Sequence, residues 1–285
     1  MKIEKYTLQA GLSKPFRVFH LSDNHLCLAD GRDDERKTAL AERREKSFSE
    51  RGGKSTAETT LELLSKVRKE NVPLLHTGDL IDFVSYKNLD FAAECFNGID
   101  TVMCAGNHEF SLYVGEAWED EAYKEQSLEK VKAAMPEGII FGVRELNGVR
   151  FITLDNSYYY ILPELYEKTK AALDCDIPCV LLVHTPLYSA DTYEKVMAGK
   201  PEDEPPYLCG CPEKLLKNLS EHRFKQQCPD KTTLDFVKLC NSSPTLKAVI
   251  TGHVHMPVFA RLDSGIPQIA ADGAYNGVMN EYIFE

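Results

Sequence analysis

Five short apolar runs, each followed at once by a polar tip, constrain the fold of this chain more than any other feature. The tips read Ser-Asp-Asn-His, Thr-Gly-Asp, Ala-Gly-Asn-His, a single His, and Thr-Gly-His. A short apolar run between turn-forming residues is typical of a strand that is buried on both faces. Because ligands gather beyond the carboxyl ends of strands in α/β sheets, we expect the tips to converge. The runs are residues 16–21, 72–76, 101–104, 180–183 and 246–250.

Helical and hairpin patterns lie between these runs. Asn147-Gly148 separates two strand-like runs and favours a type I′ hairpin turn, and a second hairpin is expected at residues 263–265. Strands that alternate with helices and are joined by some hairpins predict an α/β fold with mixed sheets. Apolar residues at helical spacing predict helices over residues 56–69, 89–96, 116–134 and 164–173.

Two segments interrupt the alternation of strands and helices in a chain of 285 residues, a length that fits one α/β domain over 1–285. Residues 30–54 are dense in both charge signs, which favours a solvated helix and loop over the alternative, a mobile flap beside the first tip. Residues 191–243 are rich in proline and poor in strand signals, and they are too long for an ordinary connection. We interpret 191–243 as an insertion that packs near the site and shapes access to it.

Charge and composition limit the kinds of partner that the chain can have. The formal net charge is −11, which disfavours binding to long nucleic acid, because that binding depends on Lys and Arg. No apolar run reaches the roughly 18 residues that a membrane span requires, and the first residues lack the apolar core of a secretory signal. The nine cysteines are expected to be reduced, and Cys209, Cys211 and Cys228 match a zinc site poorly. We therefore expect a cytoplasmic protein without membrane contacts.

The polar tips together supply nitrogen and oxygen donors that suit metal ions. A carboxylate can bridge two ions, and imidazole suits Zn, Mn, Fe, Co or Ni better than Ca or Mg. Each tip alone is common in unrelated proteins, but their ordered combination is not. The set is large enough for two first-row divalent metals, and it consists of Asp23, His25, Asp79, Asn107, His184, His253 and His255.

The ordered series D-x-H, G-D, G-N-H-E, H and G-H-x-H resembles the motif set of the calcineurin-like metallophosphoesterase superfamily. The resemblance implies a four-layer α/β/β/α sandwich with two mixed β-sheets. It also implies that Asp23, His25 and His255 bind the first metal and that Asp79 bridges both metals. The second metal would be completed by Asn107, His184 and His253.

The resemblance gives His108 and Asp82 a catalytic role. His108 would face the substrate and serve the leaving group, and Asp82 would orient it; a helix cap is the structural alternative for Asp82. Two metals can lower the pKa of a shared water, so that a bridging hydroxide attacks phosphorus. The expected activity is hydrolysis of a phosphomonoester or phosphodiester, with a small phosphorylated substrate and nucleotides among the candidates. The alternative is an inactive scaffold of this fold that works through protein contacts.

Departures from particular relatives narrow the class. Protein phosphatases of this superfamily carry arginines where this chain has Phe83 and Ala105, so a protein phosphatase is disfavoured. Glu109 has two interpretations, as a support for a metal ligand or as an exposed loop acid. His20 and His76 are expected to pack beneath the site as strand residues. The tyrosines at 158–160 are expected to pack under the insertion rather than stack on a substrate.

Overall fold

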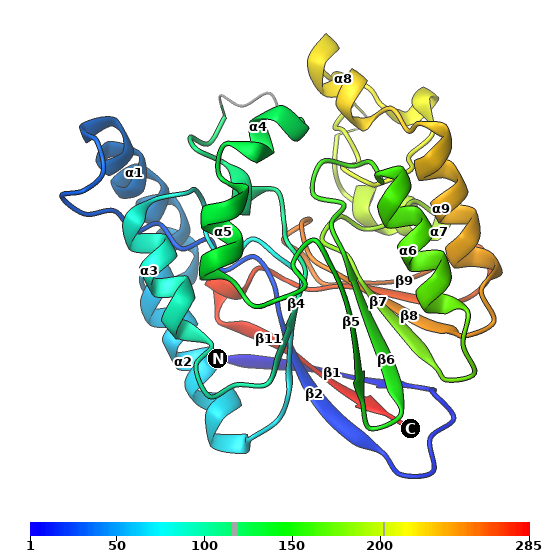
Figure 1. The fold of residues 1–285 in the computed structure, drawn as a ribbon. Helices are drawn as coiled ribbons and strands as arrows, with labels where there is room; N and C mark the ends of the chain where they lie inside the picture. Colours follow the sequence, from blue (N-terminus) through cyan, green and yellow to red (C-terminus); the bar gives the residue numbers. More distant parts are fainter. Residues whose placement is uncertain (116–118, 202) are drawn as a thin grey trace.

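Two β-sheets packed face to face form the centre of the computed structural model, which describes residues 1–115, 119–201 and 203–285 (Figure 1). The strands in these ranges are β1 Lys2–Leu8, β2 Phe16–Leu21, β3 Leu74–His76, β4 Thr101–Met103, β5 Phe141–Leu146, β6 Val149–Leu154, β7 Cys179–Leu182, β8 Leu246–Thr251, β9 Val258–Arg261, β10 Pro267–Ala270 and β11 Val278–Phe284. The first sheet has the order β1-β11-β2-β3-β4, and the second has the order β5-β6-β7-β8-β10-β9.

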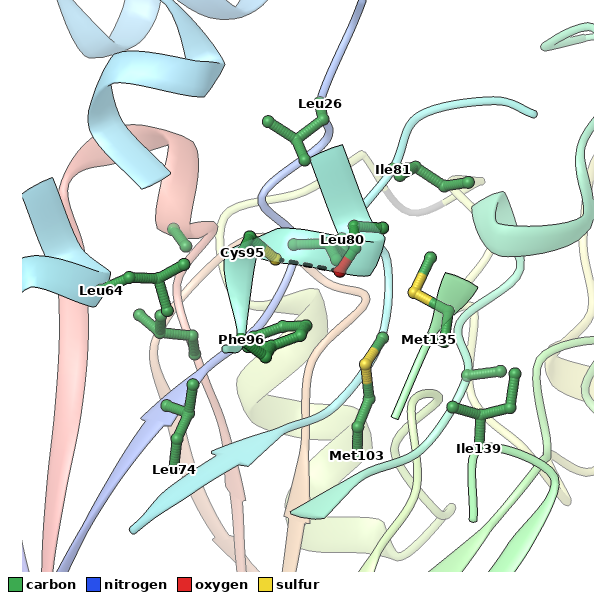
Figure 2. Packing of buried hydrophobic residues seen from close by; sticks show 14 of the residues in the cluster. Leu26, Leu64, Leu74, Leu80, Ile81, Cys95, Phe96, Met103, Met135 and Ile139 are labelled. Atoms are coloured by element: carbon green, nitrogen blue, oxygen red, sulfur yellow. Dashed lines mark hydrogen bonds between the residues drawn. The ribbon is translucent and has the colours of Figure 1, made fainter. Parts of the chain in front are cut away.

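Helices cover the outer face of each sheet, which gives the predicted four layers. Helices α2 (Thr56–Glu70), α3 (Tyr86–Cys95) and α5 (Leu128–Ala134) pack on the first sheet through one apolar cluster. Figure 2 shows part of that cluster, where Leu64, Phe96 and Met103 lie close together. Helices α6 (Pro163–Leu173) and α9 (Lys231–Ser242) pack on the second sheet.

The core between the sheets follows from the two-residue period of a strand. In β2, Phe19 and Leu21 face the helices, whereas Val18 faces the second sheet. Both faces of the strand are therefore buried, as its continuous apolar sequence predicts. Val18 and Leu75 pack there against Phe151 and Val180, so a single apolar layer joins the two sheets.

Parallel pairing brings the polar tips to one edge of the sandwich. β2 pairs with β3 and β3 with β4, all parallel. In the second sheet β6, β7, β8 and β10 are also parallel neighbours. Antiparallel pairs at β5–β6 and β9–β10 make both predicted hairpins, and the sheets are mixed, as expected. Asn147 and Gly148 have φ values of 50° and 84°, which a type I′ turn requires.

Three segments differ from, or add to, the sequence pattern. A single helix is predicted over residues 116–134. Residues 116–118 lie outside the described part of the chain, and residues 119–134 contain two short helices, α4 (Glu121–Glu125) and α5, instead of one. Helix α1 (Glu35–Gly52) occupies most of 30–54, and its inner side packs on Phe83 and Tyr275. The prediction of a solvent-exposed helix in this segment therefore holds only for the outer side of α1.

The segment 191–243 contains α7 (Ala190–Met197), the short helix η2 (Glu213–Leu215), α8 (Glu221–Gln227) and α9. Its last helix belongs to the outer layer of the second sheet, whereas Lys200, Glu204 and Tyr207 lie beside the polar tips. Among the described residues, none of the helices is long and apolar enough to cross a membrane.

Candidate metal centre

The loops that carry the polar tips have strained backbones. Asp23, His25, Asp79, His253 and His255 all have positive φ values, between 49° and 70°. Residues with a side chain rarely adopt this conformation, and where they do it often marks a functional site. Backbone hydrogen bonds hold it in place, because Asp23 donates to the Gly78 carbonyl and His25 to the Asp79 carbonyl, each at 2.9 Å.

Close contacts between these loops explain their glycines. A Cβ atom on Gly106 would lie 2.2 Å from Oδ1 of Asp79, and one on Gly252 would lie 1.8 Å from Oγ of Ser22. Neither position can hold a side chain without moving the neighbouring loop. The Gly-Asn-His and Gly-His-x-His tips therefore need glycine in order to approach the Asp79 and Asp23 loops.

The donor atoms form two groups that share Asp79. The first group contains Asp23, His25, Asp79 and His255. Nε2 of His255 lies 2.9 Å from Nε2 of His25 and 3.1 Å from Oδ1 of Asp23. The second group contains Asp79, His184 and His253. Nε2 of His184 lies 3.2 Å from Oδ2 of Asp79 and 3.1 Å from Nδ1 of His253. One carboxylate thus joins the two groups.

Asn107 supports the interpretation of this cluster as a metal site. Its Oδ1 atom is buried and has no hydrogen-bond partner, although an unpaired buried oxygen is costly. An ion in the second donor group would give that oxygen a partner. The side chains are carboxylate, imidazole and amide, which suits first-row divalent metals. The residues present therefore fit the implied metals.

Carboxylates and imidazoles of the donor groups shift one another's pKa values. Burial alone would raise the pKa of Asp79, but His184 and His108 hold it well below its usual range. Burial lowers the pKa of His253 to about 3. For His184, burial opposes the charge, yet Asp79 raises the pKa to about 9. These donors therefore lie close enough to determine one another's protonation.

Asp82 lies beside both His108 and His25. Nδ1 of His108 is 2.8 Å from the Asp82 carbonyl oxygen and 3.2 Å from Oδ1. The same Oδ1 is 2.9 Å from Nδ1 of His25. Burial alone would lower the pKa of His108, but Asp79 and Asp82 raise it to about 10. Asp82 therefore contacts the histidine that the sequence pairs with it and a metal-ligand candidate as well.

Three residues outside the predicted set support the donors. Glu109 is buried and accepts hydrogen bonds from the backbone N–H groups of Asp79, Leu80 and Gly106 at 2.6–2.7 Å. Burial, with help from Asp79, raises its pKa to about 7. The support role considered for Glu109 thus fits, and the exposed loop acid does not.

Tyr159 and Arg44 complete the supporting set. The Tyr159 hydroxyl lies 2.8 Å from Nε2 of His253, although the tyrosine run was expected only to pack under the insertion. Arg44 of α1 donates to Asp82 from Nε and Nη2. A signal for Tyr159 existed in its position after a strand end, whereas nothing in the charged pattern of 30–54 distinguishes Arg44.

His20 and His76 pack beneath the centre, as expected. Nε2 of His20 is 2.8 Å from the Thr77 hydroxyl, and Nε2 of His76 is 2.9 Å from Oδ1 of Asn24. Both rings are fully buried, and burial lowers the pKa of each, to about 3 for His20 and about 4 for His76. They are therefore neutral rings that hold the loops.

A cleft of about 310 Å³ opens over the second donor group. A cavity of about 440 Å³ lies elsewhere, between α6 and α9, and none of the predicted donors lines it. The cleft over the donors is the better candidate for a substrate site. It is lined by Asp79, Asn107, His108, Tyr159, Lys200, Glu204, Tyr207, His253, Val254 and His255.

Comparison with known families agrees with this geometry. Residues 16–257 match the family model described as calcineurin-like phosphoesterase. The chain therefore belongs to the calcineurin-like phosphoesterase family, and it is a hydrolase that acts on phosphoric ester bonds. The family and the residue cluster together indicate a dinuclear site for divalent metal ions. A comparison with curated proteins finds no match.

Solved structures share the fold at low sequence identity. A dimetal phosphatase from Danio rerio is 13% identical, with a TM-score of 0.50 over 92% of this chain and 88% of the other. The phosphopantetheinyl hydrolase of Mycobacterium tuberculosis is 12% identical, with a TM-score of 0.47 over 94% and 91%. A 5'-nucleotidase from Candida albicans is 13% identical, with a TM-score of 0.44 over 94% and 47%. The first of these likenesses supports the four-layer fold.

Proposed function

We propose that this protein hydrolyses a small phosphomonoester or phosphodiester at a centre of two divalent metal ions. The observation that carries the proposal is the position of Asp79, whose carboxylate belongs to both donor groups. Asp23, His25 and His255 would hold one ion, and Asn107, His184 and His253 would hold the other. Mn, Fe, Zn, Co and Ni all suit this mixture of imidazole and carboxylate.

When bound, two such ions lower the pKa of water and bind the phosphoryl oxygens, which supplies the nucleophile and neutralises charge. The protein contributes the fixed positions of its donors. Their strained loops are tied together by backbone hydrogen bonds and by Glu109. Little reorganisation is then needed when the substrate binds, which is how preorganised polar sites accelerate a reaction.

His108 is the proposed partner of the leaving group. It lines the cleft, and its Nδ1 is engaged by Asp82. Nε2 therefore remains for the oxygen that leaves phosphorus. The carboxylates of Asp79 and Asp82 favour the protonated ring, which can donate a proton to an alkoxide or stabilise its charge.

The 191–243 segment is proposed as the wall that limits substrate size. Lys200, Glu204 and Tyr207 from this segment line the cleft together with the donors. A volume of about 310 Å³ lies at the lower end of the range for small-molecule sites. Lys200 pairs with Glu204 at 3.3 Å, so this wall adds little net charge. A mononucleotide or a smaller phosphoester fits these features better than a nucleic acid strand. The net charge of −11 also disfavours a nucleic acid strand.

A cytoplasmic location remains part of the proposal. All nine cysteines are free, which is typical of a reducing compartment.

The proposal is tested by an activity panel on purified, metal-free protein. The substrates are 4-nitrophenyl phosphate, bis-4-nitrophenyl phosphate, nucleoside monophosphates and cyclic nucleotides, each with Mn, Zn, Fe, Co or Ni added. We expect turnover of at least one ester that requires added metal. Two metals bound without turnover of any ester would instead favour the inactive scaffold.

A further inference from the structure

The carboxylate of Asp82 is enclosed by nitrogen atoms from three elements. It is fully buried, and Oδ1 lies 2.9 Å from Nδ1 of His25 and 3.2 Å from Nδ1 of His108. Arg44 approaches from α1, with Nε 2.6 Å from Oδ2 and Nη2 2.8 Å from Oδ1. Both carboxylate oxygens are thus held in one orientation by a two-point contact, which fixes geometry better than a single charge pair.

Arg44 is itself held in place by aromatic packing. Its guanidinium carbon lies 4.9 Å from the centre of the Phe48 ring. The Phe48 ring stacks on His25, with centroids 4.7 Å apart and planes 12° from parallel. Arg44 and Phe48 are one turn apart on α1, so a single face of that helix contacts both His25 and its carboxylate partner.

The contact determines which nitrogen of His25 can serve a metal. A carboxylate beside Nδ1 accepts a hydrogen bond from the N–H group there, which keeps the proton on Nδ1 and leaves the lone pair on Nε2. Nε2 of His25 faces the first donor group, 3.8 Å from both Oδ1 of Asp23 and Oδ2 of Asp79. If the Asp82 carboxylate rotated, His25 would lose its acceptor, and His108 would lose the nearby charge at Oδ1 and keep only its contact with the Asp82 carbonyl oxygen.

We propose that Arg44 is a positioning residue that locks Asp82 between His25 and His108. In this role, which rests on the proposed two-metal hydrolysis, Arg44 sets the first metal ligand and the leaving-group histidine through one carboxylate. It touches neither substrate nor metal itself. Helix α1 is then part of the catalytic architecture, although its residues belong to none of the ordered motifs.

A purely structural role would have a different signature. Arg44 would then only fasten α1 to the sandwich, and its loss would lower the melting temperature without altering the folded site. A positioning role instead weakens metal binding at one of two sites and lowers kcat while KM is kept. Removal of a group that orients a metal ligand commonly costs 10–100-fold in affinity or activity.

The test compares Arg44→Gln and Arg44→Lys with Arg43→Gln, an exposed arginine on the same helix. Mn²⁺ is titrated calorimetrically into each metal-free protein, and kcat and KM are measured with the best substrate of the wild type. We expect Arg44→Gln to lose at least 10-fold in affinity at one site and at least 10-fold in kcat, with KM within about 2-fold. Arg44→Lys keeps the charge and should recover part of both losses, and Arg43→Gln should match the wild type.

Wild-type affinity at both sites in Arg44→Gln, with unchanged kcat, would overturn the inference. If Arg44→Gln does not fold, Arg44→Lys decides, because wild-type affinity and kcat without the two-point contact would also overturn it. The metal titration needs no substrate. An enzyme that binds two metals but hydrolyses no ester would refute the proposed function and still leave the affinity comparison to judge Arg44.

Discussion

The Tyr159 hydroxyl lies 2.8 Å from Nε2 of His253, and the other ring nitrogen of His253 lies 3.1 Å from Nε2 of His184. Tyr159 therefore fixes the ring whose Nδ1 faces the second donor group. Its own φ is 71°, an unusual backbone conformation for a bulky residue. The hydroxyl that contacts His253 is thus presented from a backbone conformation that a bulky residue rarely adopts.

Loss of the Tyr159 hydroxyl is predicted to weaken metal binding at the second site. Tyr159→Phe removes the hydrogen bond and keeps the packing, so affinity for Mn²⁺ at one site should fall about 10–100-fold. Calorimetric titration measures this directly. Tyr160→Phe is the matched control, because the Tyr160 hydroxyl contacts Glu121 instead of a donor. Equal affinities in the two variants would refute the role of Tyr159.

Substitution of Glu109 is predicted to destabilise the metal-free protein. Its two oxygens accept three backbone N–H groups from two loops. In Glu109→Gln, the NH₂ group of the amide would face at least one of these backbone N–H groups, which would then lack an acceptor. We expect a loss of about 2–3 kcal/mol in the free energy of unfolding, measured with denaturant in the presence of a chelator. Glu94→Gln, at an exposed position of α3, should change the free energy of unfolding little. A comparable loss in Glu94→Gln would show that the backbone hydrogen bonds of Glu109 do not explain the effect.

Truncation of Tyr207 is predicted to weaken substrate binding without slowing the chemical step. Tyr207 lines the cleft, its ring centre is 6.3 Å from that of His253, and its φ is 52°. Loss of one aromatic contact is worth about 0.5–1.5 kcal/mol, so KM of Tyr207→Ala for 4-nitrophenyl phosphate should rise about 2- to 10-fold. Its kcat should stay within about 3-fold of the wild type.

Tyr86→Ala is the control for this experiment, because Tyr86 is exposed on α3 and does not line the cleft. An unchanged KM in Tyr207→Ala would mean that the Tyr207 ring does not contact this substrate.

Ion pairs across three neighbouring strands of the first sheet predict a pH-dependent contribution to stability. Glu281 of β11 pairs with Lys5 of β1 at 3.0 Å and with Nε of Arg17 of β2 at 2.5 Å. Burial alone would raise the pKa of Glu281, but Lys5 and Arg17 lower it below the ordinary 4.5. A carboxylate with a depressed folded-state pKa stabilises the fold above pH 4.5 and loses that effect as the pH falls.

Glu281→Gln is therefore expected to be less stable than the wild type by about 1 kcal/mol at pH 7, because both cationic partners are exposed. The difference should shrink below about pH 4.5, where Glu281 of the unfolded chain becomes protonated. Denaturant unfolding of both proteins between pH 3 and pH 7 measures it. A difference that stays constant over this range would show that the charge of Glu281 contributes nothing.

The central sheets and the convergence of the donors could be predicted because their signals are local. Each apolar run is a strand, and parallel pairing then carries Asp23, Asp79 and His253 to one edge. Cap positions were harder to place. Helix α3 begins at Tyr86, three residues before the predicted start, because the Ser85 side chain accepts a hydrogen bond from the Asn88 N–H. That contact leaves no trace in hydrophobic periodicity.

The supporting contacts depend on tertiary structure that no local pattern encodes. Arg44 reaches a carboxylate 38 residues away, and it is one of many charged residues in its segment. Tyr159 contacts a ring 94 residues away. Both contacts exist only once the loops and α1 have packed, so the sequence predicts the donors more completely than the residues that orient them.

The most direct test of the two-metal account compares Asp79→Asn with His108→Ala in metal content and turnover. Asp79 belongs to both donor groups, so Asp79→Asn should lose bound metal and activity together. His108 is proposed to serve only the leaving group, so His108→Ala should keep two metals per chain and lose about 10²–10⁴-fold in kcat. Full activity in both variants at matched metal content would contradict the account.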